Sequence, residues 1–410
     1  MKRVLVVGSG FVGFRRYLLE NMARRHHVLL LNPGPVTWQS AYAAEHAEAD
    51  FTDRDAVLDS ASRLAGEPGV DGVLTWDESL LDITAEIAHH LDVRALTRDA
   101  ARACRDKAVQ RACFARHDVP SAEFRAATTL DEAAAAAGEI GYPVVVKPRA
   151  LAGSIAVRLV RDPSELATAA EAVLAAEGPG FSGSGGLLVE EYLTGPEISV
   201  DSWVLDGDVV PFVLARKTID APPFFLEIGH EVGGELEPGL ADQVHRVVRT
   251  ANLALGIDRA VTHTELKLTP DGPRVVEVNG RLGGDLIPYL GQLATGVEAG
   301  EVVAAVATGA RPETAPTRKG FSAVHFVYPP HQMVLDDLVV DPELSDVDWL
   351  EPVSLLLPPG TELFLPPRAF LTRVAAAVVT ADDQQTLNQR LDRVRAGLRL
   401  VGPRTSKGER

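Results

Sequence analysis

Cysteine is scarce in this sequence, which limits the kinds of site that it can build. The 410 residues include two cysteines, Cys104 and Cys113. They are nine residues apart on a predicted helical segment, so we do not expect them to pair with each other, and their spacing is not that of a zinc site. We therefore predict two reduced thiols.

The sequence also has fewer positively than negatively charged residues, and it lacks long apolar runs. The chain has 40 Lys and Arg residues against 57 Asp and Glu residues, a formal net charge of −17. This balance argues against nucleic acid or an anionic membrane as the main partner. Because no run of 18 apolar residues occurs, no membrane-spanning helix is predicted. The N-terminal segment Met1–Gly8 is typical of a first strand rather than a secretion signal, so we expect a cytoplasmic protein.

What the sequence does contain begins with an alternation of strands and helices over residues 1–95. Strands that alternate with helices favour a parallel sheet covered by helices on its faces, a doubly wound α/β domain. The predicted strands are Val4–Val7, Val28–Leu31 and Val70–Thr75, and the predicted helices are Phe11–Arg24 and Leu80–Leu91.

A glycine motif follows the first predicted strand. Residues Gly8–Gly13 match the G-x-G-x-x-G pattern of dinucleotide-binding turns, but the second strand runs into Asn32 rather than into the acidic residue that should bind a ribose. The glycines can serve a tight turn and close helix packing, or an anion or substrate contact at the helix N-terminus. Both interpretations stay open.

The composition of the remaining chain suggests three further parts. A helical segment is predicted over roughly Thr97–His117, and the segment Gly178–Gly186, with five glycines in nine residues, is typical of a loop. Prolines and polar residues near residue 310 mark another boundary. The resulting division is 1–95, 96–186, 187–310 and 311–410.

Two predicted strands carry the most informative polar residues. Thr262–Leu268 and Arg274–Val278 are joined by a predicted turn at Thr269–Gly272. Side chains two residues apart on a strand share a face, so Glu277, Asn279 and Arg281 can point at one spot, and the hairpin would bring Glu265 beside Glu277. Carboxylate and amide oxygens are hard ligands that hold Mg²⁺ against nucleotide phosphates.

The stretch from about Asp106 to Leu290 resembles the ATP-grasp superfamily, with its motifs in the expected order. Lys107 and Lys147 are similar to the two nucleotide-binding lysines, and Ala152–Ser154 resembles the phosphate-covering flap, with Ser154 as its contact. The flap usually continues with a glycine, and Ala156 stands in that region here. Ala156 is thus a departure from the family pattern within the flap.

The resemblance also implies roles for residues further along. Glu190 would bind the adenine amino group, the backbone around Glu191 and Leu193 would contact the ring edge, and Glu197 would bind the ribose hydroxyls. Glu265, Glu277 and Asn279 match the metal ligands, with Arg281 near the reacting phosphoryl group. The implied fold has an ATP-grasp core of two α+β subdomains after the N-terminal domain, and a C-terminal α+β region. The implied ligands are ATP and Mg²⁺, with Mn²⁺ as an alternative, and homodimers are common in this superfamily.

Within the superfamily, the segments Arg216–Thr218, Pro222–His230 and Asn279–Asp285 resemble the substrate regions of L-amino-acid ligases. That resemblance implies phosphorylation of a small acid to an acyl phosphate, followed by amide formation with an amine. Catalytic roles are expected for Arg281, Lys217 and His230, although a lone loop histidine is often a surface or packing residue. Substrate contacts are expected from Arg281, Gly283, Gly284 and Glu78; the glycines could equally serve a turn with positive φ, and Glu78 could be a helix N-terminal acid.

Two other functions compete with this interpretation. A carboxylating or purine-biosynthetic ATP-grasp enzyme would depend on bicarbonate, and the segment Phe224–His230 argues against it. A non-catalytic nucleotide-binding or NAD-sensing protein would use Gly8–Gly13, but it leaves the acidic hairpin unexplained.

Overall fold

The computed structural model describes residues 1–176, 185–220 and 222–404. Most of the glycine-rich loop predicted at Gly178–Gly186 lies outside these residues. The chain forms two compact units, each made of three stretches: unit 1 contains Met1–Ser121, Thr194–Leu214 and Glu235–Thr317, and unit 2 contains Ala122–Leu193, Ala215–Gly234 and Arg318–Arg410. The four-part division made from the sequence stays a prediction.

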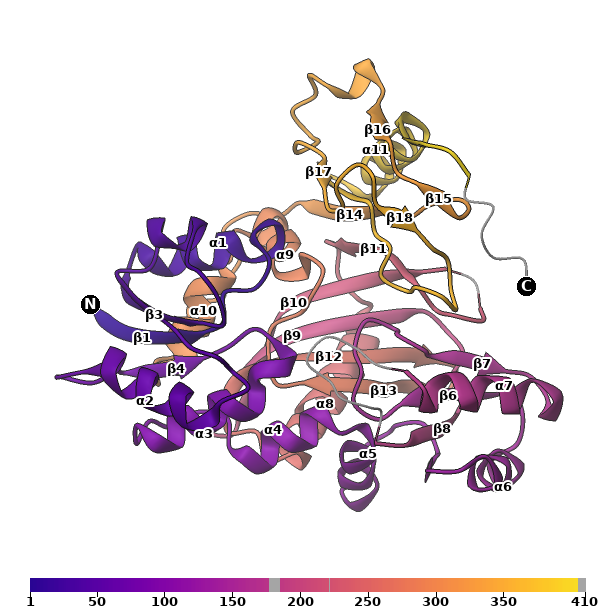
Figure 1. The fold of residues 1–410 in the computed structure, drawn as a ribbon, viewed down its shortest axis with the longest axis horizontal. Coiled ribbons are helices and arrows are strands. Elements are labelled where there is room, and N and C mark those ends of the chain that lie inside the picture. The colour runs from indigo at the N-terminus through magenta and orange to yellow at the C-terminus, as the bar shows by residue number, and fades with distance from the viewer. Residues whose placement is uncertain (177–184, 221, 405–410) are drawn as a thin grey trace. The chain divides into compact units, whose positions relative to one another are not determined.

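Unit 1 begins with a four-stranded sheet whose strands are all parallel, in the order β3-β2-β1-β4 (Figure 1). Alternate residues of its central strands face opposite layers: one face packs against α1 and α10, the other against α2 and α3. The predicted doubly wound domain is confirmed. Its elements are β1 (Lys2–Val7), α1 (Val12–Ala23), β2 (His26–Asn32), η1 (Trp38–Ala41), β3 (Glu45–Glu48), α2 (Arg54–Ala65), β4 (Gly72–Leu74), η2 (Glu78–Leu80) and α3 (Leu81–His90), with α10 (Ala299–Ala307) joining them from later in the chain.

The glycine motif forms the tight turn between β1 and α1. Gly8 and Gly10 have φ angles of 76° and 71°, which glycine adopts without strain. The Asn32 side-chain oxygen accepts hydrogen bonds from the Ser9 amide and hydroxyl, and the Trp76 indole donates to the Ser9 carbonyl. Because the polar groups of Ser9 are bonded within the protein, the turn agrees with the packing interpretation.

The second part of unit 1 is an antiparallel sheet in the order β13-β12-β9. Its core side packs against α4, α5 and α8. These elements are α4 (Arg98–Arg105), α5 (Lys107–Arg116), β9 (Glu197–Leu205), α8 (Pro238–Ala254), β12 (Arg259–Thr269), β13 (Gly272–Asn279) and α9 (Ile287–Thr295), and β10 (Asp208–Ile219) begins in this unit and ends in unit 2.

The helical segment predicted over Thr97–His117 is present, and it consists of two helices, α4 and α5. Asp106 separates them in an extended conformation, with φ −97° and ψ 103°. Its carboxylate accepts hydrogen bonds from the amides of Ala108 and Val109 and so caps a new helix. The break places Lys107 at the first position of α5.

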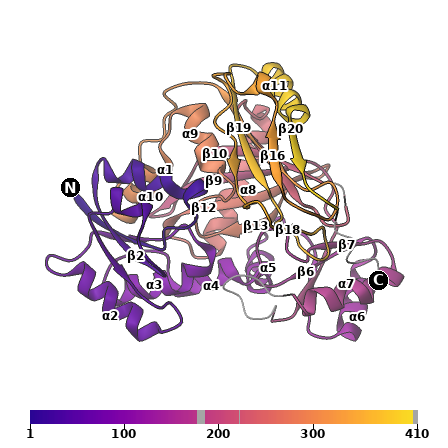
Figure 2. The same ribbon diagram turned by 45° about the horizontal axis from the view of Figure 1, so that its top comes forward.

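Unit 2 starts with a four-stranded antiparallel sheet in the order β5-β8-β6-β7, packed against α6 and α7. Its second sheet segment runs β10-β11-β14-β19-β17, and α11 packs on β14 and β19 (Figure 2). The elements are β5 (Phe124–Ala127), α6 (Leu130–Ile140), β6 (Val144–Pro148), β7 (Arg158–Val160), α7 (Pro163–Leu174), β8 (Leu187–Glu191), β11 (Glu227–Val232), β14 (Phe321–Val327), β15 (Met333–Val334), β16 (Asp337–Val340), η3 (Pro342–Leu344), β17 (Ser354–Leu355), β18 (Glu362–Leu363), β19 (Ala375–Ala381), α11 (Gln384–Gly397) and β20 (Leu398–Val401).

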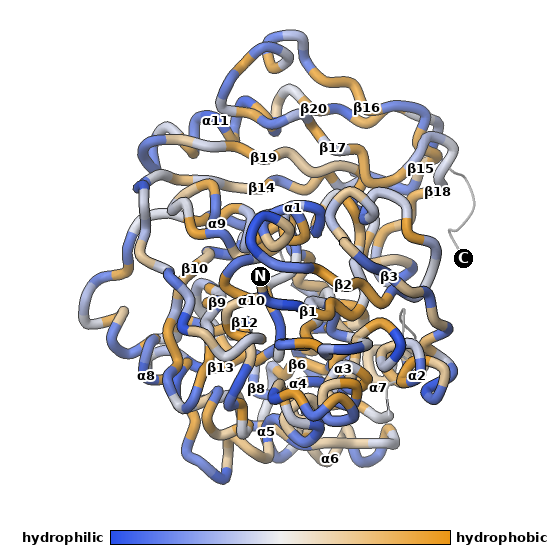
Figure 3. Tube along the Cα trace, turned by 90° about the vertical axis from the view of Figure 1, so that its left-hand side faces the viewer, coloured by the Kyte–Doolittle hydropathy of each residue, from blue (hydrophilic) through white to orange (hydrophobic). Residues whose placement is uncertain are grey.

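Hydrophobic residues follow the buried strands of both units. In the N-terminal sheet, Val4–Val7 and Val28–Leu31 form continuous apolar runs, as expected for parallel strands covered on both faces (Figure 3). Among the residues that the structure describes, no helix is both long and apolar enough to cross a membrane.

Candidate functional site

The predicted acidic hairpin is present in unit 1. β12 and β13 are antiparallel, and Glu265 lies directly opposite Glu277 in the register, as predicted. Asn279 follows two residues later on β13 and is buried. The turn at Thr269–Gly272 is also confirmed, with the Thr269 hydroxyl donating to the Gly272 carbonyl at 2.8 Å. The hairpin therefore brings together two carboxylates on paired strands, the hard donor type that suits Mg²⁺.

β13 ends the β13-β12-β9 order, and side chains of α5 bind its outer backbone groups. Gln110 donates to the Val278 carbonyl at 2.8 Å and accepts from the Val278 amide at 3.0 Å. Arg111 donates to the Val276 carbonyl at 2.5 Å. Both residues of α5 are fully buried. These bonds replace the missing neighbour strand and fix the backbone on either side of Glu277.

The first predicted nucleotide lysine lies at the same strand. The Lys107 ammonium is 3.0 Å from a Glu277 carboxylate oxygen, and the two side chains are 8% and 17% exposed. Lys107 begins α5, three and four residues before Gln110 and Arg111, so these three side chains point from one helix face toward β13. The structure thus brings a predicted phosphate-binding cation to a predicted metal ligand.

The predicted ribose-binding carboxylate is paired with a lysine that the sequence did not single out. Glu197 opens β9 directly opposite Lys267 on β12, and the ammonium lies 3.1 Å from the carboxylate. Lys267 also donates to the Gly195 carbonyl at 3.3 Å. The alternating pattern of β12 could have indicated that Lys267 shares a face with Glu265.

Arg281 and Glu78, both predicted substrate contacts, form an ion pair in unit 1. The Arg281 Nε lies 3.0 Å from a Glu78 oxygen, and the side chains are 13% and 12% exposed. Glu78 begins η2, directly after β4 of the N-terminal sheet. Burial raises the pKa of Glu78 to about 6, although the Arg281 charge acts in the opposite direction. The carboxyl group therefore titrates close to neutral pH.

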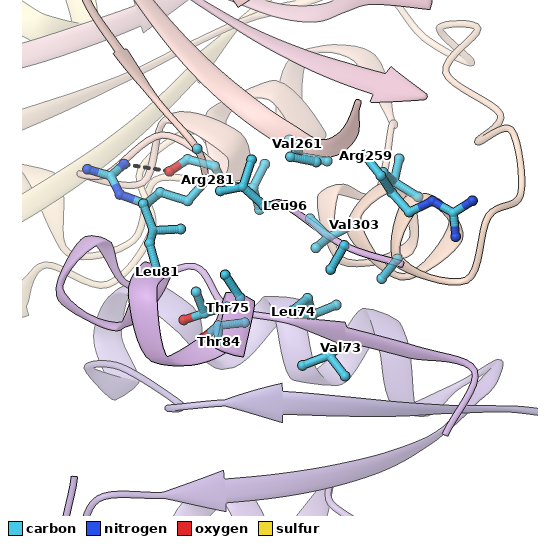
Figure 4. Close-up of a pocket in the computed structure, with 17 residues that line it drawn as sticks. Val73, Leu74, Thr75, Leu81, Thr84, Leu96, Arg259, Val261, Arg281 and Val303 are labelled. Carbon is cyan, nitrogen blue, oxygen red and sulfur yellow. Dashed lines mark hydrogen bonds between the residues drawn. The ribbon is translucent and has the colours of Figure 1, made fainter. Parts of the chain in front are cut away.

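Arg281 lines a small, mainly apolar cavity of about 50 Å³. Figure 4 shows its guanidinium pointing away from the cavity, with a hydrogen bond from Nη1 to the Leu282 carbonyl, and Arg259 at the other end. Side chains such as Val261 and Val303 line the space between them. The apolar lining leaves the charged end of Arg281 directed toward Glu78.

The peptide of Gly283 is held on both sides. Its amide donates to Asp201 at 3.2 Å, and its carbonyl accepts from Arg15 of α1 at 3.0 Å. The explanation of Gly283 and Gly284 by positive φ is wrong, because the positive φ angles of this loop belong to Asp285 and Leu286. Gly283 is required for space instead: a Cβ atom there would lie 2.9 Å from the His263 ring and 3.1 Å from Asp201.

Asp201 and His263 were missed by the sequence analysis, and both are buried in unit 1. They stand opposite each other on β9 and β12, with His263 Nδ1 2.6 Å from an Asp201 oxygen. His263 Nε2 lies 3.4 Å from Glu265. Burial by itself would lower the pKa of His263, but the Asp201 and Glu265 carboxylates outweigh it and raise this pKa to about 9. The position of His263, two residues before Glu265 on the same strand face, was the available signal.

The second predicted nucleotide lysine lies in unit 2. Lys147 is the penultimate residue of β6, and its ammonium is 2.6 Å from Glu190 on the neighbouring β8, with each side chain 6% exposed. The next residue, Glu191, donates its amide to the Glu123 carbonyl at 2.9 Å. Leu193 is also buried, at 9% exposure. The predicted adenine-binding residues and Lys147 therefore come together on β6, β8 and the segment after β8.

The predicted flap has an unusual backbone. Gly153, Ser154 and Ala156 all have positive φ, at 68°, 56° and 57°. For alanine this conformation costs roughly 1–2 kcal/mol relative to glycine. Its methyl group is buried against the core around β6 and β7, which offsets part of that cost. Ala156 thus takes a conformation that glycine favours.

Lys217 and His230 meet in unit 2, where they face each other on β10 and β11. The expectation of a loop histidine is wrong, since His230 lies on β11 and is fully buried. Both residues contact Glu227, at 2.8 Å from the Lys217 ammonium and 3.4 Å from His230 Nε2. Arg373 adds a second cation, 4.0 Å from the same carboxylate. Glu227 belongs to the segment Pro222–His230 that resembles a substrate region, although no role was assigned to it. Arg373 was not predicted, because it is distant in sequence.

The structure divides the predicted residues between the two units. In unit 1 the predicted metal-binding and substrate-binding residues lie on β12, β13, the loop after β13 and η2, with Lys107 beside them. In unit 2 the predicted nucleotide-binding residues lie around β6 and β8, and Lys217 and His230 lie on β10 and β11. The unit 1 residues are Glu78, Lys107, Glu197, Glu265, Glu277, Asn279, Arg281, Gly283 and Gly284, and the unit 2 residues are Lys147, Ser154, Glu190, Glu191, Leu193, Lys217 and His230.

Residues 140–289 match the family model of the ATP-grasp domain. The chain is 28% identical over 264 residues to alanine–anticapsin ligase of Bacillus subtilis, covering 60% of this chain and 55% of that protein. The chain thus spans about half the length of this curated relative.

Solved structures share the fold over nearly the whole chain. An L-amino acid ligase from Bacillus licheniformis superimposes with a TM-score of 0.82 at 21% identity, covering 98% of this chain and 99% of that one. A phosphoribosylglycinamide synthetase from Anaerococcus prevotii gives a TM-score of 0.71 at 17% identity, covering 98% and 100%. At these identities the likeness establishes the ATP-grasp fold and leaves the substrates open.

Proposed function

Because the chain carries an ATP-grasp domain, we propose that it is an ATP-dependent carboxylate–amine ligase that acts on an amino acid or a related small acid. The observation that supports this most directly is the hairpin in which Glu265 opposes Glu277, followed at once by Asn279 and Arg281. A metal-binding strand that runs into a substrate-binding arginine suits phosphoryl transfer to a carboxylate.

We assign the nucleotide-binding roles residue by residue. We assign the adenine amino group to Glu190, the ring edge to the backbone at Glu191 and Leu193, and the ribose hydroxyls to Glu197. Lys107 and Lys147 carry positive charge for the phosphate oxygens. Ser154 contributes to the flap that excludes water from the phosphates.

Glu265, Glu277 and Asn279 would hold Mg²⁺, or Mn²⁺ in its place. The donor set consists of two carboxylates and one amide, and the two carboxylates are directly opposed across the hairpin. When bound, the metal neutralises charge on the transferring phosphoryl group. The Lys107 ammonium, 3.0 Å from Glu277, can serve the same phosphate charge.

The reaction has two steps. A carboxylate oxygen of the acid attacks the γ-phosphorus of ATP, the bond to ADP breaks, and an acyl phosphate forms. The amine nitrogen then attacks the acyl carbon, phosphate leaves, and the nitrogen releases a proton to phosphate or solvent. Arg281 would orient the carboxylate, and the amides of Gly283 and Gly284 would approach the oxyanion.

Amino acids are the proposed substrates because the related protein and the structural neighbour are an alanine ligase and an L-amino acid ligase by name. A zwitterionic substrate needs both a cation and an anion in its site. The Arg281–Glu78 pair supplies one of each, at 3.0 Å from each other. The Lys217, His230 and Glu227 group supplies a second such combination.

The test is phosphate and ADP release across a matrix of amino acids and amines with Mg²⁺ and ATP. We expect ADP and phosphate in equal amounts only in wells that contain both an acid and an amine. Glu277→Ala should reduce turnover by on the order of 100-fold or more, with the fold intact, because a charged ligand is lost.

Three results would contradict the proposal or a part of it. Formation of AMP and pyrophosphate would exclude an acyl phosphate. Turnover that requires bicarbonate and no amine would favour a carboxylating enzyme instead. Full activity of Glu277→Ala would remove Glu277 from the metal site. Glu20→Ala, on an exposed position of α1, is the matched control and should behave as wild type.

A further inference from the structure

A continuous line of buried polar contacts joins the hairpin to the loop that follows it. Glu265 lies 3.4 Å from His263 Nε2, His263 Nδ1 lies 2.6 Å from Asp201, and the other Asp201 oxygen accepts the Gly283 amide at 3.2 Å. The Asp201 side chain is fully buried and that of His263 is 4% exposed. The chain of contacts connects a proposed metal ligand with a proposed substrate contact.

The imidazole is the only member of this line that binds carboxylates on two sides. A ring that meets an acceptor at each nitrogen donates both of its N–H groups, which fixes the ring orientation. Asp201 in turn uses both oxygens, one toward the ring and one toward a backbone amide. Each group therefore restricts the position of the next.

The packing around Gly283 makes the connection rigid. A Cβ atom at this position would lie within 3.2 Å of three atoms of His263 and Asp201. Arg15 binds the Gly283 carbonyl from the opposite side. The loop therefore has little room to move without displacing Asp201 or His263.

We propose that Asp201 and His263 are positioning residues that set the Gly283 peptide and the Glu265 carboxylate relative to each other. This inference rests on the proposed function, because it takes Glu265 as a metal ligand and Gly283 as a substrate contact. Groups behind a metal ligand typically alter metal affinity by 10–100-fold when removed. Here Asp201 and His263 would position both a metal ligand, Glu265, and a substrate contact, Gly283.

Two substitutions at one position separate the two halves of the line. The amide nitrogen of asparagine matches histidine Nδ1, so His263→Asn keeps a donor toward Asp201 and loses the one toward Glu265. The amide nitrogen of glutamine matches Nε2, so His263→Gln keeps the donor toward Glu265 and loses the one toward Asp201. Asp201→Ala removes the contact with Gly283 directly.

The experiment measures metal binding and loop protection without requiring turnover. Mn²⁺ binding in the presence of ADP is followed by electron paramagnetic resonance, and hydrogen exchange is followed in the peptide that contains residues 281–286. We expect His263→Asn to raise the Mn²⁺ Kd about 10-fold and to leave exchange in this peptide unchanged. We expect His263→Gln and Asp201→Ala to accelerate exchange of residues 281–286 and to change the Mn²⁺ Kd less than 3-fold.

Asn21→Leu is the matched control for loss of a buried polar contact. Asn21 is 2% exposed, and its side chain accepts the Gly300 amide at 3.4 Å, a bond that joins α1 to α10 and involves no residue of β12 or β13. This variant should lower the melting temperature while leaving the Mn²⁺ Kd and the exchange of residues 281–286 unchanged. Effects of equal size on both readouts in the two His263 variants, or none in either, would overturn the proposal.

Failure of the proposed function has a different signature. In that case the wild-type protein forms no ADP with any acid and amine, or Glu277→Ala leaves Mn²⁺ binding unchanged. The second result removes the metal site and therefore also overturns the positioning role. If the wild type turns over and both His263 variants keep the wild-type Mn²⁺ Kd and hydrogen exchange, the proposed ligase function stands and only the positioning role is rejected.

Discussion

At the scale of single residues, the ion pair of Glu78 and Arg281 combines two proposed substrate contacts, and the pKa of Glu78 is raised. Glu78 and Arg281 come from η2 and from the loop after β13, and their side chains are little exposed. Sequence analysis found both residues because each follows a strand end. It could not predict that they would contact each other, since that depends on how the loop after β13 turns toward the N-terminal sheet of unit 1.

This pair predicts the pH dependence of the reaction. The pKa of Glu78 is raised to about 6, so the carboxyl group becomes protonated as the pH falls through this value and stops balancing Arg281. We expect kcat/KM for the amino acid to fall about tenfold per pH unit below pH 6. Initial-rate measurements between pH 5 and 8 test this.

Glu78→Gln is the matching variant. It has no titrating carboxyl group, so its activity should be lower at pH 8, by roughly 10-fold, and should lose the acidic limb that Glu78 causes. An unchanged limb in this variant would assign the titration to another group.

At the scale of elements, the hairpin depends on a helix that borders it. β13 ends the strand order of its sheet in unit 1, and Gln110 of α5 bonds both backbone groups of Val278. A strand without a second neighbour is otherwise free to shift its polar groups. The helix therefore helps to hold Glu277 and Asn279 on the same face.

Gln110→Met tests this support by keeping the side-chain length and removing the hydrogen bonds. Two buried backbone groups lose their partner, at a cost of about 1–3 kcal/mol each. We expect lower stability in urea together with an increase of about 10-fold in the KM for Mg²⁺. Gln110→Glu retains the acceptor for the Val278 amide. Its stability and its KM for Mg²⁺ should lie between those of the wild type and those of Gln110→Met.

A purely structural role for α5 gives a different result. Stability would then fall in Gln110→Met while the KM for Mg²⁺ stayed at the wild-type value. The Asn21→Leu variant provides that comparison, because its buried amide supports α1 and not β13.

Strong patterns made most elements predictable. The alternating residues of β12 and β13 and the turn between them predicted the hairpin and its register. The break between α4 and α5 was not predicted, because the helical pattern continues through Asp106. Only the capping bonds of Asp106 to the amides of Ala108 and Val109 mark the start of a second helix. β11 was missed because Pro222 and Pro223, just before it, indicate a loop.

At the scale of the whole molecule, each unit is assembled from stretches that are far apart in the sequence. A division into consecutive segments could not anticipate this, because strand pairing decides which stretches belong together. β9 pairs with β12, about sixty residues later, and this pairing brings Asp201 beside His263. The same cause explains why Arg373 was not predicted: it reaches Glu227 from another part of unit 2.

The family resemblance supplied what periodicity could not. Composition and strand patterns predict an α/β protein with an acidic hairpin, and the order of the motifs predicts ATP-grasp chemistry. The match of residues 140–289 to the family model of the ATP-grasp domain independently supports the prediction made from the motifs. The identities of the acid and the amine depend on side chains in loops such as residues 281–286, whose conformations follow from tertiary contacts.

The central claim is that the acid is activated as an acyl phosphate, and isotope transfer tests it most directly. The acid substrate is supplied with ¹⁸O in both carboxylate oxygens, together with the amine, Mg²⁺ and unlabelled ATP, and the products are analysed by mass spectrometry. The account predicts one ¹⁸O atom in each phosphate formed and one in each amide product, with none in ADP. Unlabelled phosphate, or ¹⁸O in AMP, would contradict it.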